Sequence, residues 1–244
     1  MPKDNFSKQS ATYAQFRPHY PDELYHFIYD HTHAFHTAWD CATGNGQVAR
    51  VLCEQFDQVF ATDISLNQMA QAVQAPNITY QKGSAEHSGL PANEVDLVTV
   101  AQAIHWFNLR DFYKEVKRVA RPTGALAYWG YYLPKISEKI DPLLWHFHDH
   151  KLGPYWDPER KIWASKYNLI DLPLKNRKEK NFEYVAKWNL SHFQGYLTSW
   201  SAVQHFITTN KYNPVDEFIK TLRPLWQQKK QVRFPIFLTL GQIS

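Results

Sequence analysis

A chain of 244 residues with 44% hydrophobic residues and a formal net charge of +4 is long enough for one α/β domain with an insertion, and this composition excludes disorder throughout. The densest basic runs, 175–180 and 229–233, are short and typical of solvated loops, so we do not expect a nucleic-acid partner. The two cysteines favour a reducing, cytoplasmic location, and the chain has neither the apolar start of a signal peptide nor an apolar run near the roughly 18 residues of a membrane span.

Strands and helices alternate in the first half of the chain. The pattern predicts strands at 37–41, 58–62, 78–82, 95–101 and 125–130. It predicts helices after Pro21, from near Gly46, over 66–74 behind a Ser65 cap, and through 112–119 to a stop at 121–124. About five strand–helix units over residues 22–130 indicate a Rossmann-like, doubly wound parallel sheet.

The alternation stops after Tyr132. Residues 134–180 have helical and loop-like patterns, and we expect them to cap the ligand edge of the sheet. The remaining patterns predict a strand at 182–188, helices at 191–207 and 214–226, and a last strand at 232–240. We therefore expect a single domain over 1–244, with an N-terminal lid and helix (1–36), a cofactor-binding core (37–133), a cap insertion (134–180) and C-terminal strands and helices of the core (181–244).

A glycine turn joins the first predicted strand to the helix that follows it. Gly44 and Gly46 permit a tight turn and a close approach of the backbone to a ligand. Asp63 ends the second strand at the same edge, where a carboxylate can accept hydrogen bonds from both hydroxyls of a ribose. The sequence therefore predicts a site for an adenine nucleoside at this edge of the sheet.

Two nucleoside cofactors fit this pattern. Residues 44–49 match G-x-G-x-x-A, the dinucleotide fingerprint, so an NAD-linked oxidoreductase is one alternative. Asp40, just before the glycines, is unfavourable beside a pyrophosphate but favourable beside the ammonium and sulfonium groups of S-adenosylmethionine. Tyr113 and Lys117 have the spacing of the short-chain dehydrogenase pair, but they follow the fourth strand rather than the fifth, so we interpret them as helix-surface residues.

The glycine turn resembles motif I of class I S-adenosylmethionine-dependent methyltransferases. That motif has an acid followed by glycines at alternate positions, as in Asp40-x-Ala42-x-Gly44-x-Gly46, where Ala42 replaces the first glycine. Residues 59–63 resemble motif II, whose acid binds the ribose. Residues 83–86 resemble the loop over the adenine.

The resemblance extends beyond the cofactor motifs. Residues 101–107 are similar to the segment after the fourth strand in the methyltransferase-11 group. Residues 13–21, 195–202 and 234–241 resemble trans-aconitate-methyltransferase-like proteins, in which the first of these segments forms a lid. The resemblance implies a mainly parallel seven-stranded sheet with an antiparallel last strand. It also implies methyl transfer from S-adenosylmethionine to a small molecule.

The acceptor is the less specific part of this prediction. Arg17 can form a bidentate pair with a carboxylate, so we expect a small carboxylic acid that is converted to its methyl ester. A methyltransferase that acts on RNA or protein is a further alternative, although the chain lacks a basic stripe for RNA.

The resemblance implies a set of cofactor-binding residues and a set of catalytic candidates. The cofactor-binding set is Tyr13, Asp40, Ala42, Gly44, Gly46, Asp63, Ile64, Ser84, Ala85, Glu86, Ala101 and Trp106. The catalytic candidates are Arg17, Tyr20 in the lid, which can pack over the methionine end, and His105, which can act as a base or a hydrogen-bond donor. The histidine clusters at 31–36 and 146–150 lack the further ligands that a metal site needs, so we expect no metal.

Overall fold

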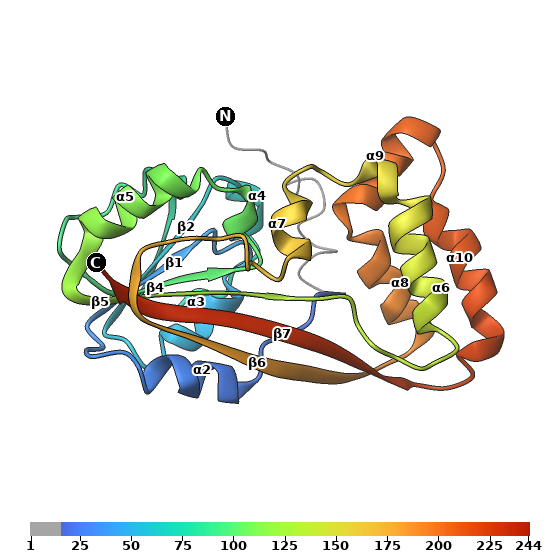
Figure 1. The fold of residues 1–244 in the computed structure, drawn as a ribbon, viewed down its shortest axis with the longest axis horizontal. Coiled ribbons are helices and arrows are strands. Elements are labelled where there is room, and N and C mark those ends of the chain that lie inside the picture. Colours follow the sequence, from blue (N-terminus) through green and yellow to red (C-terminus); the bar gives the residue numbers. More distant parts are fainter. Residues whose placement is uncertain (1–15) are drawn as a thin grey trace.

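The computed structural model describes residues 16–244 as a mixed sheet with helices on both faces and a helical region at one end (Figure 1). Its seven strands in this range are β1 (Thr37–Cys41), β2 (Gln58–Asp63), β3 (Ile78–Lys82), β4 (Val95–Ala101), β5 (Ala120–Tyr131), β6 (Leu174–Trp188) and β7 (Lys230–Ile243). Their order is β3-β2-β1-β4-β5-β7-β6. β7 runs antiparallel to β5 and β6, and the other neighbouring pairs are parallel. The predicted fold class is therefore confirmed.

Four helices pack on the parallel part of the sheet: α2 (Asp22–Tyr29), α3 (Gln47–Leu52), α4 (Leu66–Met69) and α5 (Leu109–Val119). Figure 1 shows α5 over one face and α2 and α3 over the other. The central strands β1 and β4 are buried along nearly their whole length, as parallel strands covered on both faces should be. Ser65 caps α4 as expected, since its Oγ accepts a hydrogen bond from Gln68 N at 3.2 Å. The helix is shorter than predicted, however, because it ends at Met69.

The helical region at the far end, which we call the cap region, is built from two separate stretches of chain. Its helices are α6 (Asp141–His146), a π-helical turn (Phe147–Lys151), α7 (Arg160–Ala164), α8 (Leu190–Thr198), α9 (Ser201–Asn210) and α10 (Pro214–Leu222), with short 3-10 turns at Gly153–Tyr155 and Arg223–Leu225. A further 3-10 turn, Ile104–Trp106, lies between β4 and α5 in the sheet region. Helices α8–α10 connect β6 to β7 at the end of a long ribbon (Figure 1). Phe147 stacks on Phe218 of α10 with ring centroids 4.3 Å apart, which joins the two stretches. No helix within residues 16–244 combines the length and apolarity needed to cross a bilayer.

Several element boundaries differ from the sequence predictions. β6 begins at Leu174, so the basic run 175–180 lies in a strand and not in a loop of the cap insertion. The run is exposed because β6 is an edge strand, and lysine-rich edges resist pairing with other chains. The helix predicted over 191–207 is broken at Trp200, whose backbone is extended (φ −72°, ψ 137°). β5 begins at Ala120, because pairing with β4 extends the strand beyond its apolar segment.

Candidate functional site

An open pocket of about 1030 Å³ lies at the carboxyl ends of β1, β2 and β4, and we call it the sheet-edge pocket. Open α/β sheets bind their ligands at this edge. The pocket is lined by Tyr20, Asp40, Ala42, Thr43, Gly44, Asn45, Gln47, Val48, Asp63, Ile64, Ser65, Gln68, Gly83, Ser84, Ala85, Glu86, Ala101, Gln102, Ala103, Trp106 and Phe107. Of the predicted cofactor-binding residues, Tyr13 lies outside the described residues and Gly46 is absent from the lining. The structure brings the others together.

The glycine turn is held to the end of β2. Ala42, Gly44 and Gly46 have positive φ angles of 56°, 57° and 76°. The Gly44 N–H donates to Asp63 Oδ2 at 2.8 Å, which fixes the turn against the second strand. A Cβ at Gly46 would clash with the hydroxyl of Tyr80. Gly46 is therefore required by its positive φ and by close packing against β3, and the predicted ligand contact has no support in its position.

Asp40 lies beneath the turn with 1% of its surface exposed. Its Oδ2 accepts hydrogen bonds from Thr43 Oγ1 (2.5 Å) and Ala49 N (3.1 Å), and its Oδ1 accepts one from Thr99 Oγ1 (3.0 Å). Burial raises the pKa of Asp40 to about 6, although these hydrogen bonds oppose the shift. Asp40 thus joins the turn to α3 and β4, and a cation bound in the pocket would favour its ionised form.

Asp63 stands at the tip of β2 with 8% of its surface exposed. Its Oδ1 accepts a hydrogen bond from Ser65 N at 2.8 Å, as Oδ2 does from Gly44 N. A carboxylate at the end of a strand can accept hydrogen bonds from the hydroxyls of a ribose. Gln68 lines the same pocket, and its Oε1 is buried without a hydrogen-bond partner in the described part of the chain.

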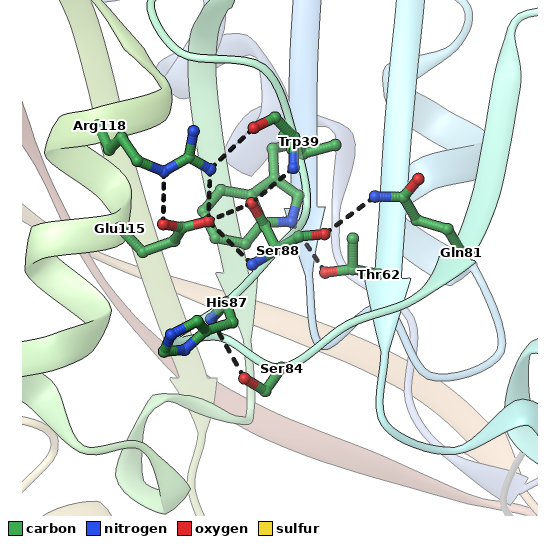
Figure 2. A network of polar contacts seen from close by, with 9 residues as sticks. Trp39, Thr62, Gln81, Ser84, His87, Ser88, Glu115 and Arg118 are labelled. Atoms are coloured by element: carbon green, nitrogen blue, oxygen red, sulfur yellow. Dashed lines mark hydrogen bonds and ion pairs between the residues drawn. The ribbon is translucent and has the colours of Figure 1, made fainter.

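The loop after β3, residues 83–88, is fixed from behind by α5 (Figure 2). Glu115 Oε1 accepts hydrogen bonds from Ser88 N (2.9 Å) and Ser88 Oγ (2.5 Å). Arg118 donates to both oxygens of Glu115 at 2.7 and 2.8 Å, and these bonds lower the pKa of Glu115 to about 2. Gln81 Nε2 donates to Ser88 O at 2.9 Å. The network therefore holds the wall that contains Ser84, Ala85 and Glu86.

A second pocket of about 510 Å³ adjoins the first, and we call it the arginine pocket. It is lined by Arg17, Gln102, His105, Trp106, Tyr131, Leu133, Trp156, Arg160, Trp163, Tyr196, Trp200 and Ser201. Gln102 and Trp106 line both pockets. Within residues 16–244, no aspartate or glutamate lines the arginine pocket. The site is therefore suited to an anionic ligand beside whatever occupies the sheet-edge pocket.

The two arginines differ in their surroundings. Arg17 Nη1 donates to Tyr131 Oη at 2.6 Å and Nη2 donates to Ser199 O, at the end of α8, at 3.0 Å. Arg160 lies between the rings of Trp156 and Trp163, at 3.7 and 3.6 Å from their centroids. None of the ion pairs among the described residues involves Arg160, and its Nε is buried without a partner there. Burial lowers the pKa of Arg160 to about 9.

His105 is buried in the wall of the arginine pocket. Its Nδ1 lies 3.0 Å from Tyr167 Oη. Burial, and then the charge of Arg160, lower the pKa of His105 to about 3. The ring is therefore neutral near pH 7 and a weak base. This favours the hydrogen-bonding role predicted for His105 over the base role.

A family model described as a methyltransferase domain matches residues 39–128. The chain is 33% identical to a Dictyostelium discoideum protein named as a methyltransferase, over 98% of this chain and 95% of that protein. The chain belongs to the methyltransferase family. A Saccharomyces cerevisiae protein named as an S-adenosylmethionine-dependent methyltransferase is 23% identical over 92% of this chain and 91% of its own length. A solved structure from Anaeromyxobacter dehalogenans, named as a type II methyltransferase, is 34% identical with a TM-score of 0.84, over 93% of this chain and 98% of that chain.

The enzyme is thus an S-adenosylmethionine-dependent methyltransferase, and its sheet-edge pocket fits that cofactor. The backbone turn at Gly44 leaves room for close approach, and Asp63 and Gln68 line the pocket with polar side chains suited to a ligand that carries hydroxyl and amino groups. Asp40 adds a negative charge for the cationic methionine end. Among these relatives the NAD-linked alternative has no counterpart.

Several residues that line the arginine pocket were missed by sequence reasoning. Gln102, between the pockets, has a φ of 56°, which residues with side chains rarely adopt, and its Oε1 is buried without a partner among the described residues. Trp156, Arg160 and Trp163 recur at i, i+4 and i+7, a spacing that could have indicated a common face. No group of three or more His, Cys, Asp or Glu suited to a metal occurs in residues 16–244, although the rings of His146 and His150 lie 4.7 Å apart.

Proposed function

We propose that this methyltransferase transfers a methyl group from S-adenosylmethionine to the carboxylate of a small organic acid, which becomes a methyl ester. The observation that carries the proposal is the arginine pocket, because it presents two guanidinium groups and no acidic side chain among its described lining residues. A carboxylate is the anion that an arginine fork binds bidentately. The lining, which is mainly aromatic side chains with a few polar groups, supports a small molecule over an RNA or a protein segment.

The sheet-edge pocket would hold the methyl donor through residues from three strand ends. Asp63 would bind the ribose, the wall at 84–86 the adenine, and the turn at 42–44 the methionine end. Tyr20 and Trp106 would close the pocket on the acceptor side. Tyr13, in the lid segment, would contact the cofactor as well. Tyr20 packs edge-on against Trp129 with ring centroids 5.4 Å apart, so its position is supported from below.

The reaction needs little chemistry from the protein. S-adenosylmethionine supplies an activated methyl group on a sulfonium. A carboxylate oxygen forms the new C–O bond while the methyl–sulfur bond breaks and its electron pair stays on sulfur, so the products are a methyl ester and S-adenosylhomocysteine. No proton is released from a carboxylate, so no general base is required. The low pKa of His105 is consistent with such an acceptor, whereas a phenol or amine would need proton removal.

Two further features agree with this proposal. The leader and the last strand resemble trans-aconitate-methyltransferase-like proteins, which is the finer family position that we propose. Cys41 and Cys53 are both free thiols, which supports the cytoplasm as the proposed location.

The test is incubation of the full chain with isotope-labelled S-adenosylmethionine and a panel of small organic acids, each paired with its amide, together with phenols and amines. We expect base-labile methyl esters from at least one acid and no product from the amides. Labelled phenols or amines without any ester would contradict the proposal. RNA binding with a steep salt dependence would favour the RNA alternative.

A further inference from the structure

We propose that His148, with Asp149 behind it, is a positioning residue that holds Arg160 as the acceptor's charged anchor without neutralising it. The inference rests on the proposed function and deepens it, because it says which arginine binds the carboxylate and how that arginine is aimed. His148 and Asp149 do not line the pocket and belong to the π-helical turn that follows α6.

The three side chains form a directed chain of hydrogen bonds. Arg160 Nη2 lies 2.9 Å from His148 Nε2, and His148 Nδ1 lies 2.5 Å from Asp149 Oδ1. A guanidinium can only donate, so Nε2 must be the acceptor and the proton of the neutral ring must be on Nδ1, where it donates to Asp149. His148 is buried, with 7% of its surface exposed, whereas Asp149 reaches the surface. The carboxylate of Asp149 therefore keeps the proton of His148 on Nδ1, and the unprotonated Nε2 then holds the guanidinium of Arg160 in place.

A neutral histidine at position 148 can hold Arg160 without cancelling its charge, which an acidic side chain could not do. A carboxylate in direct contact with Arg160 would form a buried ion pair and compete with the acceptor for the same fork. The neutral imidazole accepts one N–H and leaves the positive charge uncompensated. A buried, unpaired charge is costly, and an anionic ligand in the pocket would remove that cost.

The π-helical turn and β5 hold the aromatic rings that surround the guanidinium. Trp156 Nε1 donates to the carbonyl oxygen of His148 at 3.0 Å, and Trp163 Nε1 donates to Tyr131 O at 3.1 Å. Both rings are thereby fixed on the two faces of Arg160, with only its edge left for a ligand. π-helical turns are rare and recur at functional sites, where they displace side chains from regular helical positions.

Arg17 does not have these properties. Arg17 donates hydrogen bonds to Tyr131 Oη and to the carbonyl oxygen of Ser199, directly after α8, so it joins β5 to the cap region. The geometry thus assigns anchoring of the acceptor to Arg160 and assigns Arg17 mainly to the structure of the wall.

The test measures binding by calorimetry to the full chain saturated with S-adenosylhomocysteine. The probes are benzoate and fumarate, with benzamide and fumaramide as uncharged controls. The variants are His148→Phe, which keeps a ring but removes the acceptor, His148→Gln, which keeps an acceptor, and Asp149→Asn. His146→Phe is the matched control, because His146 is exposed on α6 and lines neither pocket.

We expect His148→Phe to weaken carboxylate binding about tenfold or more, while S-adenosylhomocysteine affinity and amide binding stay unchanged. His148→Gln should restore most of the affinity, and Asp149→Asn should lose several-fold, about what one orienting hydrogen bond contributes. Carboxylate binding by His148→Phe equal to that of the unmodified chain would overturn the positioning role alone. If His148→Phe does not fold, Asp149→Asn decides, and unchanged carboxylate affinity overturns the inference. Absence of carboxylate binding by the unmodified chain, together with methylation of another class of acceptor, would overturn the proposed function as well.

Discussion

The sheet-edge pocket and the arginine pocket share a wall but are specified in different ways. The first is formed by short strand–turn–helix segments in which neighbours in sequence are neighbours in space, such as the turn from Asp40 to Gly46. The second combines residues from the leader, β5, α7 and the α8–α9 junction, which lie far apart in the chain. Cofactor binding is therefore encoded locally, whereas acceptor choice depends on tertiary packing of the cap region. If this division holds, variants in one pocket should leave the other ligand's affinity unchanged.

The largest effect should follow replacement of Arg160 by methionine. We expect a loss of about 100-fold in kcat/KM for the acceptor acid, because the partner of a buried charge is removed. The affinity for S-adenosylmethionine should remain unchanged. Steady-state kinetics and calorimetry measure both. Lys161→Met is the matched control, since Lys161 is exposed on the same helix. A parallel loss of cofactor affinity in Arg160→Met would break the proposed separation of the pockets.

The reverse selectivity is expected for Glu115→Gln. The change removes the charge that Arg118 and Ser88 bind behind the loop at 83–88, so cofactor affinity should fall about tenfold. Carboxylate binding to the cofactor-saturated enzyme should not change. The exposed Glu217→Gln on α10 serves as the control. Unaltered S-adenosylhomocysteine affinity would show that the network is not needed to shape this wall.

A pH dependence should be confined to the sheet-edge pocket. The free protein holds Asp40 with a pKa of about 6, above the ordinary 3.8, so its contribution to stability is present below 3.8 and is lost as the pH rises through about 6. Binding of a cation favours the ionised carboxylate. Affinity for S-adenosylmethionine should therefore rise with pH and level off above about 6, with at most about tenfold loss per pH unit below it. Calorimetric titrations from pH 5 to 7.5 measure this, and Asp40→Asn should give a flat profile. A slope that persists in Asp40→Asn would assign the titration to another group.

The smallest expected effect concerns Ala42. Its φ of 56° is unfavourable for a side chain, so Ala42→Gly should raise the free energy of unfolding by up to about 1 kcal/mol. Ala49→Gly, inside α3, should lower it by about the same amount, because glycine is disfavoured in helices. Denaturant unfolding of both variants measures the contrast. Equal destabilisation by the two would show that the turn tolerates alanine without strain.

The sequence allowed prediction of most of the sheet region because its signals are short-range. The strands at 37–41 and 95–101 are nearly continuous apolar runs, and the glycine turn has fixed spacing. The role of Gly46 was predicted less well, since packing against Tyr80 depends on a strand further along the chain. The sequence did not indicate Arg160 as a site residue. Its contacts with His148 and Trp156 depend on the π-helical turn, which has no local sequence signal. The polar composition of residues 175–180 predicted a loop, but these residues form part of β6 because hydrogen bonding to β7 outweighs their low intrinsic preference for a strand.

The position of β7 has a consequence for biosynthesis. It follows β6 and helices α8–α10 in sequence, yet it lies between β5 and β6 and is the strand to which β6 is hydrogen-bonded in the described sheet. On the ribosome, β6 and helices α8–α10 are complete before the segment that attaches them exists. Assembly of this half of the molecule must therefore wait for residues 230–243, a non-local step of the kind that slows folding. A truncation before Lys230 would leave β6 without the strand that it pairs with in the described sheet, and the cap helices α8–α10 would then be held only by side-chain contacts such as Phe147 on Phe218.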